Sequence, residues 1–554
     1  MSKTNDQARR DFLKVFAGTL AGGTALSLFP QLRLMESALA ADLPAPTAGA
    51  YRALVCVYMS GGSDSFNLLI PSDSARYAVY NAARGGVFAG TPGPLAIDQA
   101  ALLPVNLNGL PSGESYGLHP ACADWTAVDR NGVQTANMPG LQSLTNRGKI
   151  AWVANVGTLV VPTTQANYGS AATLKPPQLF SHNDQTNVWF QGRSTANFRY
   201  GWGGLVGDLL AIENSPIGTT GLTLPLGISF AGANRFQVGN QVVPFQVSNC
   251  GNPNGGNAIA GSPVGSNFAG CSGATRMNNF RTCATAAPTR AEIALCSMLA
   301  APQTNTLSAE HARLMSGSIN LSAQLDLAIA SATAANPSLL ATPFRALADD
   351  AIVPGVNTAA DGGNGLAEQL AMVARMIKVR AALGQNRNVF FVSLGGFDTH
   401  ATQMADNTQP RLLRRISRAL GAFYKALEEM SLENNVTTFT MSEFGRTLNS
   451  NGDGSDHGWG SVSLVMGGAI NNAGPLNSGG RLVGQFPDQR LVGSPNTIFT
   501  RGQMIPTTSA DSVASTLASW MGVSQANLNT IFPHLVNFTS GTPYNLGFMN
   551  PAPP

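Results

Sequence analysis

The stretch YRALVCVYM at residues 51–59 is followed directly by SGGSDS at residues 60–65. The first part is a continuous apolar run rich in β-favouring residues, which is typical of a strand buried on both faces. The second part carries two adjacent glycines, which permit a tight turn, and then Asp64. We therefore expect a core strand whose carboxyl end opens into a polar loop.

Further apolar runs recur along the chain, at residues 150–156, 388–394, 436–441 and 462–466. Residues 365–383 and 410–430 place apolar side chains at helical spacing. Uniformly apolar strands that alternate with amphipathic helices favour an α/β fold, with a parallel or mostly parallel sheet covered on both faces. In such folds ligands bind at the carboxyl ends of the strands. We therefore expect a ligand site in the loops that follow the strands.

The N-terminus has the features of an export signal. Residues 8–14 read ARRDFLK, residues 15–32 are weakly apolar, and small residues at Ala38 and Ala40 precede Ala41. These are the three regions of a twin-arginine signal peptide, although a short amphipathic helix is the alternative. We expect residues 1–40 to direct export of the folded chain by the twin-arginine translocase, and residues 41–554 to form the mature domain. The expected location is periplasmic or secreted.

Composition narrows the class of protein further. With 554 residues, 44% of them hydrophobic, the chain can bury a large core. Once the signal is left out, basic and acidic residues nearly balance, which gives no reason to expect a nucleic-acid or anionic-membrane partner. No later stretch reaches the roughly 18 continuous apolar residues of a membrane span.

A Gly/Asn/Ser-rich insertion is expected at about residues 215–300, where the alternation of strands and helices stops. Four of the six cysteines lie in this part of the chain: Cys250, Cys271, Cys283 and Cys296. In an oxidising compartment two disulfides are the simplest interpretation, with a connectivity that spacing does not reveal. A metal site is disfavoured because no Cys-x-x-Cys pair or nearby histidine accompanies them. Cys56 and Cys122 are expected to be free thiols.

Polar residues gather after the predicted strands. Three of the six histidines follow strand ends with an aspartate within two positions: His182, His400 and His457. Imidazole nitrogen and carboxylate oxygen together suit zinc or manganese, whereas calcium prefers oxygen alone. Asp398 and His400, at positions i and i+2 of an extended segment, would project to the same side and share an ion.

The adjacent Asp456 and His457 would diverge if extended, so they would contact different ions, or one would bind a metal while the other has an orienting role. Two divalent ions would clamp the attacking and leaving oxygens of a phosphoryl or sulfuryl group. Any single aspartate here is better explained as a helix cap or turn residue, but the recurrence of aspartates at successive strand ends favours a shared site. The predicted metal ligands are Asp64, His182, Asp398, His400, Asp456 and His457.

Three further residues complete the predicted site. Ser181 is the candidate nucleophile, since it precedes a predicted helix whose N-terminus favours an anionic ester; the alternative is that it only caps the helix. Arg446 is the expected anion clamp through its bidentate fork. Glu443 is expected to be a further ligand or a base. His119, in the segment GLHPA, would be either another site residue or a loop histidine.

Several motifs together resemble a known family. They are the twin-arginine signal, GGSDSFNLLIP, GLHPA, SHNDQTNVW, GGFDTH, SEFGRT followed by DHG, and RGQMIPTTS. The chain resembles the exported bacterial proteins of the domain of unknown function 1501 (DUF1501) family, placed with the alkaline phosphatase and sulfatase superfamily. The resemblance implies a three-layer α/β/α core with a two-metal hydrolase site at the strand ends.

The resemblance also implies roles for particular residues. Asp64 resembles the first-strand metal aspartate of the superfamily, Asp398 with His400 resembles a ligand segment, and either Glu443 or Asp456, with His457, resembles the later ligands. There is no Cys-x-Pro-x-Arg sulfatase signature and no clear phosphatase serine motif, which leaves the two chemistries open.

Two hypotheses follow from the sequence. The first is an exported metal-dependent hydrolase that acts on phosphate or sulfate esters, either small or borne on a polymer. The second is a non-catalytic extracytoplasmic binding or assembly module that retains the hydrolase fold, with the insertion as its contact surface.

Overall fold

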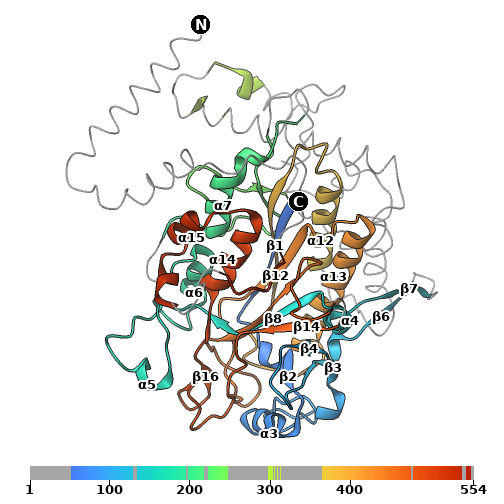
Figure 1. The fold of residues 1–554 in the computed structure, drawn as a ribbon, viewed down its shortest axis with the longest axis vertical. Coiled ribbons are helices and arrows are strands. Elements are labelled where there is room, and N and C mark those ends of the chain that lie inside the picture. The colour runs from blue at the N-terminus through green and yellow to red at the C-terminus, as the bar shows by residue number, and fades with distance from the viewer. Residues whose placement is uncertain are drawn as a thin grey trace.

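The computed structural model describes residues 51–128, 134–194, 198–217, 223–247, 297–302, 305, 308–309, 312, 365–475, 478–538 and 545–550. The predicted export signal and the four cysteines of the predicted insertion lie outside these residues. Within them, the chain forms a mixed, mostly parallel ten-stranded sheet with helices packed against it (Figure 1).

The first described strand, β1 (Arg52–Ser60), lies in the middle of the sheet. It pairs in parallel with β11 (Arg387–Gly395) on one side and with β12 (Val436–Met441) on the other. Every residue between the two ends of β1 is buried. This burial confirms the prediction that the apolar run forms a core strand, and it explains why the run lacks alternating polar residues.

One strand of the sheet runs against the others. β13 (Ser461–Met466) pairs antiparallel with β12 and with β8 (Ile150–Gly157). Parallel pairings extend the sheet beyond β11 and β8, through β9 (Gly227–Ser229), β10 (Phe245–Gln246), β14 (Gly480–Val483), β4 (Leu107–Asn108) and β17 (Thr508–Ser509). Because β12 and β13 are antiparallel neighbours, the loop at residues 442–460 leaves and re-enters the sheet at the same edge.

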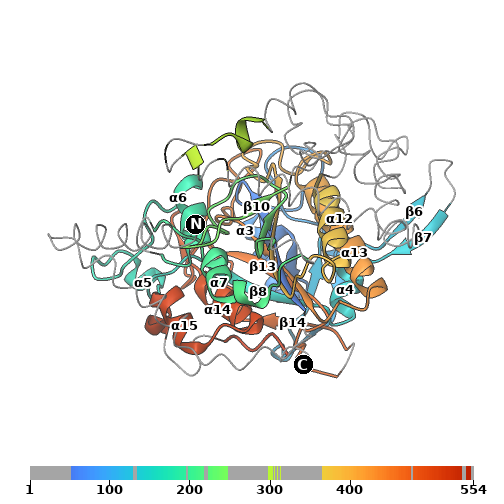
Figure 2. The ribbon, with the colours of Figure 1, turned by 90° about the horizontal axis from the view of Figure 1, so that it is seen from above.

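Helices cover both faces of this sheet (Figures 1 and 2). Alternate residues of β1 belong to different cores: Val55 and Val57 pack with the helices of one face, and Leu54 and Cys56 with those of the other. One face carries α4 (Leu141–Asn146), α12 (Gly365–Lys378) and α13 (Gln409–Glu429). The opposite face carries α6 (His182–Gln191), α7 (Trp202–Leu210), α14 (Ala510–Met521) and α15 (Gln525–Ile531).

The predicted α/β class with a mostly parallel sheet is confirmed, and so are the free, buried thiols of Cys56 and Cys122. A short hairpin, β15 (Thr497–Ile498) and β16 (Gln503–Met504), lies outside the main sheet. Among the described helices, none has both the length and the apolar composition required to cross a bilayer.

Candidate metal centre

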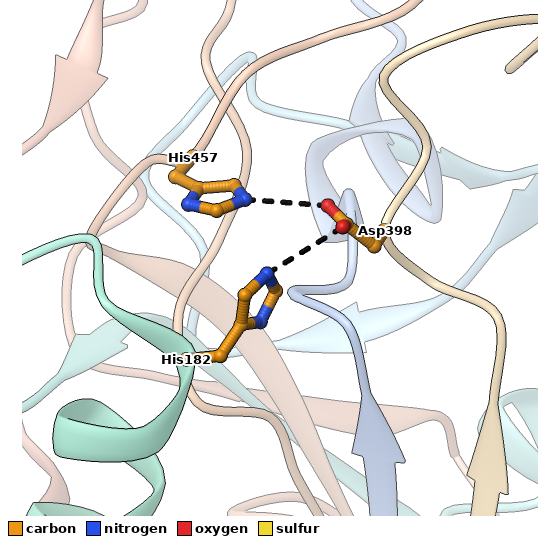
Figure 3. A group of neighbouring side chains, drawn as sticks. All are labelled: His182, Asp398 and His457. Carbon is orange, nitrogen blue, oxygen red and sulfur yellow. Dashed lines mark hydrogen bonds and ion pairs between the residues drawn. The ribbon is translucent and has the colours of Figure 1, made fainter.

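Two histidine rings point at one carboxylate beside the carboxyl ends of the central strands (Figure 3). Asp398 follows β11, His457 lies in the loop between β12 and β13, and His182 is the first residue of α6. His182 Nε2 lies 3.5 Å from Asp398 Oδ2, and His457 Nε2 lies 3.2 Å from Asp398 Oδ1. The ligand atoms of all three residues lie within 4.8 Å of one another, so the group is compact enough to hold an ion.

His400 adds a third imidazole on the exposed side of this group. Its Nε2 lies 3.1 Å from Asp398 Oδ1 and 3.0 Å from His457 Nε2. The side chain of His400 is 44% exposed, whereas that of His457 is 23% exposed. Asp398, His182, His400 and His457 are called the metal cluster below.

The partner of each Nδ1 atom fixes the tautomer of each ring. His457 Nδ1 lies 2.7 Å from the carbonyl oxygen of Phe180, which can only accept, so this nitrogen carries the proton. His182 Nδ1 lies 2.8 Å from Glu443 Oε1, and His400 Nδ1 lies 3.2 Å from Asp456 Oδ1. In the neutral rings all three Nε2 atoms are therefore unprotonated and available as ligands.

A cation within this group of nitrogen and oxygen atoms would stabilise it. Nε2 of His400 and Nε2 of His457 lie 3.0 Å apart, and both lie within 3.2 Å of Asp398 Oδ1. Burial lowers the pKa of His457, the nearby Arg446 and His182 lower it too, and the bonds to Phe180 and Asp398 only partly compensate. The net shift of the pKa of His457 is downward, which favours the neutral ring that can bind a cation.

The distances between the ligand atoms fit one divalent ion. Tetrahedral zinc with bonds of about 2.0–2.1 Å separates neighbouring ligand atoms by about 3.3 Å. The three contacts of the histidines with Asp398 and the contact between His400 and His457 run from 3.0 to 3.5 Å, and the ligand atoms of His182, Asp398 and His457 all lie within 4.8 Å of one another. Burial raises the pKa of Asp398, but the bond and charge of Arg446, followed by His400 and His182, outweigh it, so the net shift is downward. The cluster thus offers an ionised carboxylate together with imidazole nitrogens, a ligand set that suits zinc or manganese.

The two glycines predicted to form a tight turn after β1 let the loops of the site approach closely. Gly61 has φ +123°, and a Cβ atom added there would lie 2.3 Å from the backbone nitrogen of Asp398. Its own N–H donates to Glu443 Oε1 at 2.8 Å, the oxygen that also accepts from His182. Glu443 is buried and orients a ligand instead of belonging to the metal cluster.

Arg446 is fully buried, and its guanidinium is used inside the protein. Nη1 donates to Asp398 Oδ1 at 2.8 Å and to the carbonyl of Gly61 at 3.3 Å, and Nη2 donates to the carbonyl of Ser455. The guanidinium of Arg446 therefore fixes the carboxylate of Asp398 from inside the protein. An anion clamp would need this guanidinium on an open surface.

Asp456 lies beside the metal cluster without joining it. Its Oδ1 accepts from His400 and from Asn451 Nδ2 at 3.0 Å, and its Oδ2 lies 2.6 Å from Arg501 Nη1. Burial raises the pKa of Asp456, but these hydrogen bonds and the charge of Arg501 lower it by more. The net shift is downward, so the carboxylate stays ionised. Of the two readings of the Asp456 and His457 pair, this geometry matches the one in which His457 binds and its neighbour orients another ligand.

Arg501 is the polar residue that our sequence reasoning missed. It lies at the turn between β15 and β16. Its side chain is 42% exposed, whereas Arg446 is fully buried. The motif RGQMIPTTS, which begins at Arg501, contributed only to the family resemblance. No charge pattern or spacing singles it out.

The structure does not bring Asp64 to the metal cluster. The carboxylate is buried and pairs with Arg84, the C-cap residue directly after α3 (Ser74–Ala83), through contacts of 2.6 and 2.9 Å. Gln403 Nε2 donates to the same carboxylate at 2.6 Å. The cation that neutralises Asp64 is thus a guanidinium, and no sequence pattern predicts this partner.

Two further candidates are placed by local contacts. Ser181 occupies the N-cap position of α6, next to His182 in the chain, and its hydroxyl donates to Asp184 Oδ2 at 2.6 Å. His119 is buried, and its Nδ1 accepts from the backbone of Ala121 at 3.0 Å. Burial, assisted by the charge of Arg414, lowers the pKa of His119 to about 4, which favours the neutral ring.

A family model described as protein of unknown function (DUF1501) matches residues 309–495. Over these residues the chain is similar to the DUF1501 family. No curated protein and no solved structure gives a significant match. The DUF1501 segment supplies every residue of the metal cluster except His182, which α6 contributes from earlier in the chain. The DUF1501 description assigns no activity to its members.

Proposed function

We propose that this protein is an exported, metal-dependent hydrolase of phosphate or sulfate esters with an alkaline-phosphatase-like core. One observation carries the proposal: the Nε2 atoms of His182, His400 and His457 converge on Asp398 while each Nδ1 is held by an acceptor. A divalent ion at such a cluster acts as a Lewis acid on an ester oxygen and lowers the pKa of a bound water.

The proposal is for one ion at the described residues, whereas the sequence suggested two. Asp64, the ligand expected from the first strand, is neutralised by Arg84. Asp456 is shared between Arg501 and His400. These pairings leave a single compact set of ligand atoms among the described residues.

The protein's own groups have separate tasks in this proposal. Glu443 and the Phe180 carbonyl keep Nε2 of two histidines unprotonated, and Arg446 fixes the carboxylate of Asp398. Ser181 is retained as the candidate nucleophile of the chain, because Asp184 already accepts its hydroxyl proton and is placed to take it up during attack. In the net reaction water breaks the bond from phosphorus or sulfur to the ester oxygen, and the alcohol leaves with a proton.

Metal analysis of protein purified without a chelator tests the proposal most directly. We expect about one zinc or manganese ion per chain, lost in Asp398→Ala and retained in the matched control Asp406→Ala, which removes an exposed aspartate outside the cluster. Aryl phosphate and aryl sulfate, assayed in parallel, then separate the two chemistries. The same metal content in wild-type protein and Asp398→Ala would overturn the metal site.

Full metal occupancy without turnover of either ester would instead favour the alternative of a non-catalytic binding or assembly module. Ser181→Ala adds a second test. Loss of turnover with unchanged metal content supports Ser181 as nucleophile, and unchanged turnover removes it from the mechanism.

Export through the twin-arginine translocase to the periplasm or beyond belongs to the same proposal, supported by the paired arginines at residues 9–10. Changing both to lysine should leave the protein in the cytoplasm, as measured by fractionation. Thiol counting before and after reduction tests the two disulfides proposed for the insertion, and six titratable thiols in the unreduced, unfolded protein would contradict them.

A further inference from the structure

The turn between β15 and β16 lies against the loop that carries the metal cluster. The backbone N–H of Leu448 donates to the carbonyl of Gly502 at 3.2 Å, and that of Asn449 donates to the carbonyl of Arg501 at 3.0 Å. Arg501 also reaches Asp456, the partner of His400. The turn is therefore fixed at the edge of the site.

Three aromatic rings line this edge and are called the aromatic rim below: Tyr168, Phe180 and Phe499. The ring of Phe499 packs edge-to-face on Phe180 and on Tyr168, with centroids 6.3 and 5.9 Å apart. Phe499 is nevertheless 56% exposed. The backbone carbonyl of Phe180 is the acceptor for His457, so the rim begins one hydrogen bond from the metal cluster.

Two members of the aromatic rim have an unusual backbone. Phe180 has φ +73° and Phe499 has φ +57°, a region that bulky residues rarely adopt and that glycine adopts without strain. Bulky residues persist in such conformations when the surrounding structure holds them there, and these positions cluster at functional sites. Phe180 and Phe499 thus carry phenyl rings at two positions where a glycine would have less backbone strain.

The same turn presents a positive charge. Arg501, two positions after Phe499, has a half-exposed guanidinium whose only described carboxylate partner is Asp456. An aromatic surface and a guanidinium on one turn, beside a metal cluster, are complementary to a ligand that carries both an aromatic ring and an anionic group.

We infer that the aromatic rim is a subsite for the aromatic group of the substrate, with the anionic group at the metal cluster and Arg501. The substrate class is then an aryl phosphate or aryl sulfate. The identity of the anionic group as an ester rests on the proposed function, whereas the preference for an aromatic ring rests on the rim.

Binding of two non-hydrolysable anions to zinc-loaded protein tests the inference without any turnover. Phenylphosphonate should bind about tenfold more tightly than methylphosphonate, because an aromatic contact of this kind contributes about that factor. Phe499→Gly should abolish this preference while leaving methylphosphonate binding unchanged, and Phe499→Tyr should keep it. Because glycine tolerates the positive φ, the glycine variant is expected to fold.

Val492→Ala is the matched control, since Val492 is also a large exposed apolar residue, on a different loop. Equal affinity for the two phosphonates, or a preference that survives Phe499→Gly, would overturn the subsite. Failure of the protein to hydrolyse any ester would overturn the proposed function alone, since the binding comparison does not depend on it.

Discussion

His182 Nδ1 lies 2.8 Å from Oε1 of Glu443, so a buried carboxylate sets the orientation of a partly exposed imidazole. The same oxygen accepts the N–H of Gly61 at 2.8 Å, which ties the ring to the turn after the central strand. Glu443 therefore affects the metal cluster through its hydrogen bond to the Nδ1 side of His182. Carboxylates support histidine ligands in the same way in metal sites.

The first prediction concerns this contact. Glu443→Gln keeps the shape of the side chain but removes the charge that makes His182 a better ligand. We expect metal affinity to fall about 10- to 100-fold, with one ion still bound at saturation. Competition with a chromophoric chelator measures the affinity. Glu429→Gln, at the exposed end of α13, is the control, and equal affinities in the two variants would contradict the role assigned to Glu443.

The second prediction concerns the glycine turn. Gly61→Ala places a methyl group against the backbone of Asp398, whereas Gly86→Ala, at φ +104°, meets nothing within 4 Å. Both variants should lose about 1–2 kcal/mol to the left-handed backbone. Only Gly61→Ala should also displace Asp398, so its metal content should fall and its melting temperature should drop further. Retention of full metal binding in Gly61→Ala would show that Asp398 tolerates the displacement.

The third prediction concerns the buried ion pair of Asp64 and Arg84, whose side chains are both 0% exposed. Arg84→Met leaves the Asp64 carboxylate buried without its counterion, which should destabilise the fold by about 3–5 kcal/mol. Asp64→Asn combined with Arg84→Met should recover part of this loss, as measured by urea unfolding. Arg76→Met, at a partly exposed pair with Asp73, should cost at most about 1 kcal/mol.

Metal content decides how this pair is interpreted. We expect the double variant to bind as much metal as the wild-type protein, because Asp64 does not contact the metal cluster. Loss of an ion in Asp64→Asn would return Asp64 to the ligand set and restore the original two-metal hypothesis.

The fourth prediction concerns pH. Asp511, in the first turn of α14, is fully buried, and burial raises its pKa to about 7 although the charge of Arg193 opposes this. Below about pH 4 both the folded and unfolded states hold the proton. Between about pH 4 and 7 only the unfolded state releases it, so this group removes about 4 kcal/mol of stability as pH rises through that window.

Asp511→Asn removes the titration and should flatten the pH dependence of the unfolding free energy between pH 4 and 7. Urea unfolding at several pH values measures this. Asp406→Asn makes the same change of charge at an exposed position and should keep the wild-type slope. Identical slopes in the wild-type protein and Asp511→Asn would show that Asp511 is ionised in the fold.

The apolar runs allowed the strands to be predicted closely. Residues 436–441 coincide with β12, and residues 462–466 differ from β13 by one position. The direction of β13 could not be predicted, because an apolar run buried on both faces looks the same in either orientation. Helices α12 and α13 were predictable because their apolar residues repeat with the period of a helix.

The site was only partly predictable, for a different reason. A histidine after a strand end is visible in the sequence, but the partner of its Nδ1 is decided by packing. Phe180 holds His457 through a backbone carbonyl, a contact with no sequence signal. Asp64 resembles a ligand in sequence, yet Arg84 neutralises it from the end of a helix whose docking no local pattern reveals.

The position of β1 between β11 and β12 has a consequence for the order of folding. Tyr51 bonds to Asn388 across 337 positions of the chain, and Gly61 bonds to Glu443 across 382. Contacts of such high sequence separation form slowly, because a long loop must close before they are gained. The ligands of the metal cluster come together only after these strands have paired. Metal uptake, as proposed for this cluster, is therefore expected late on the folding pathway, and an ion present during synthesis would have no assembled site from which to nucleate the early strands.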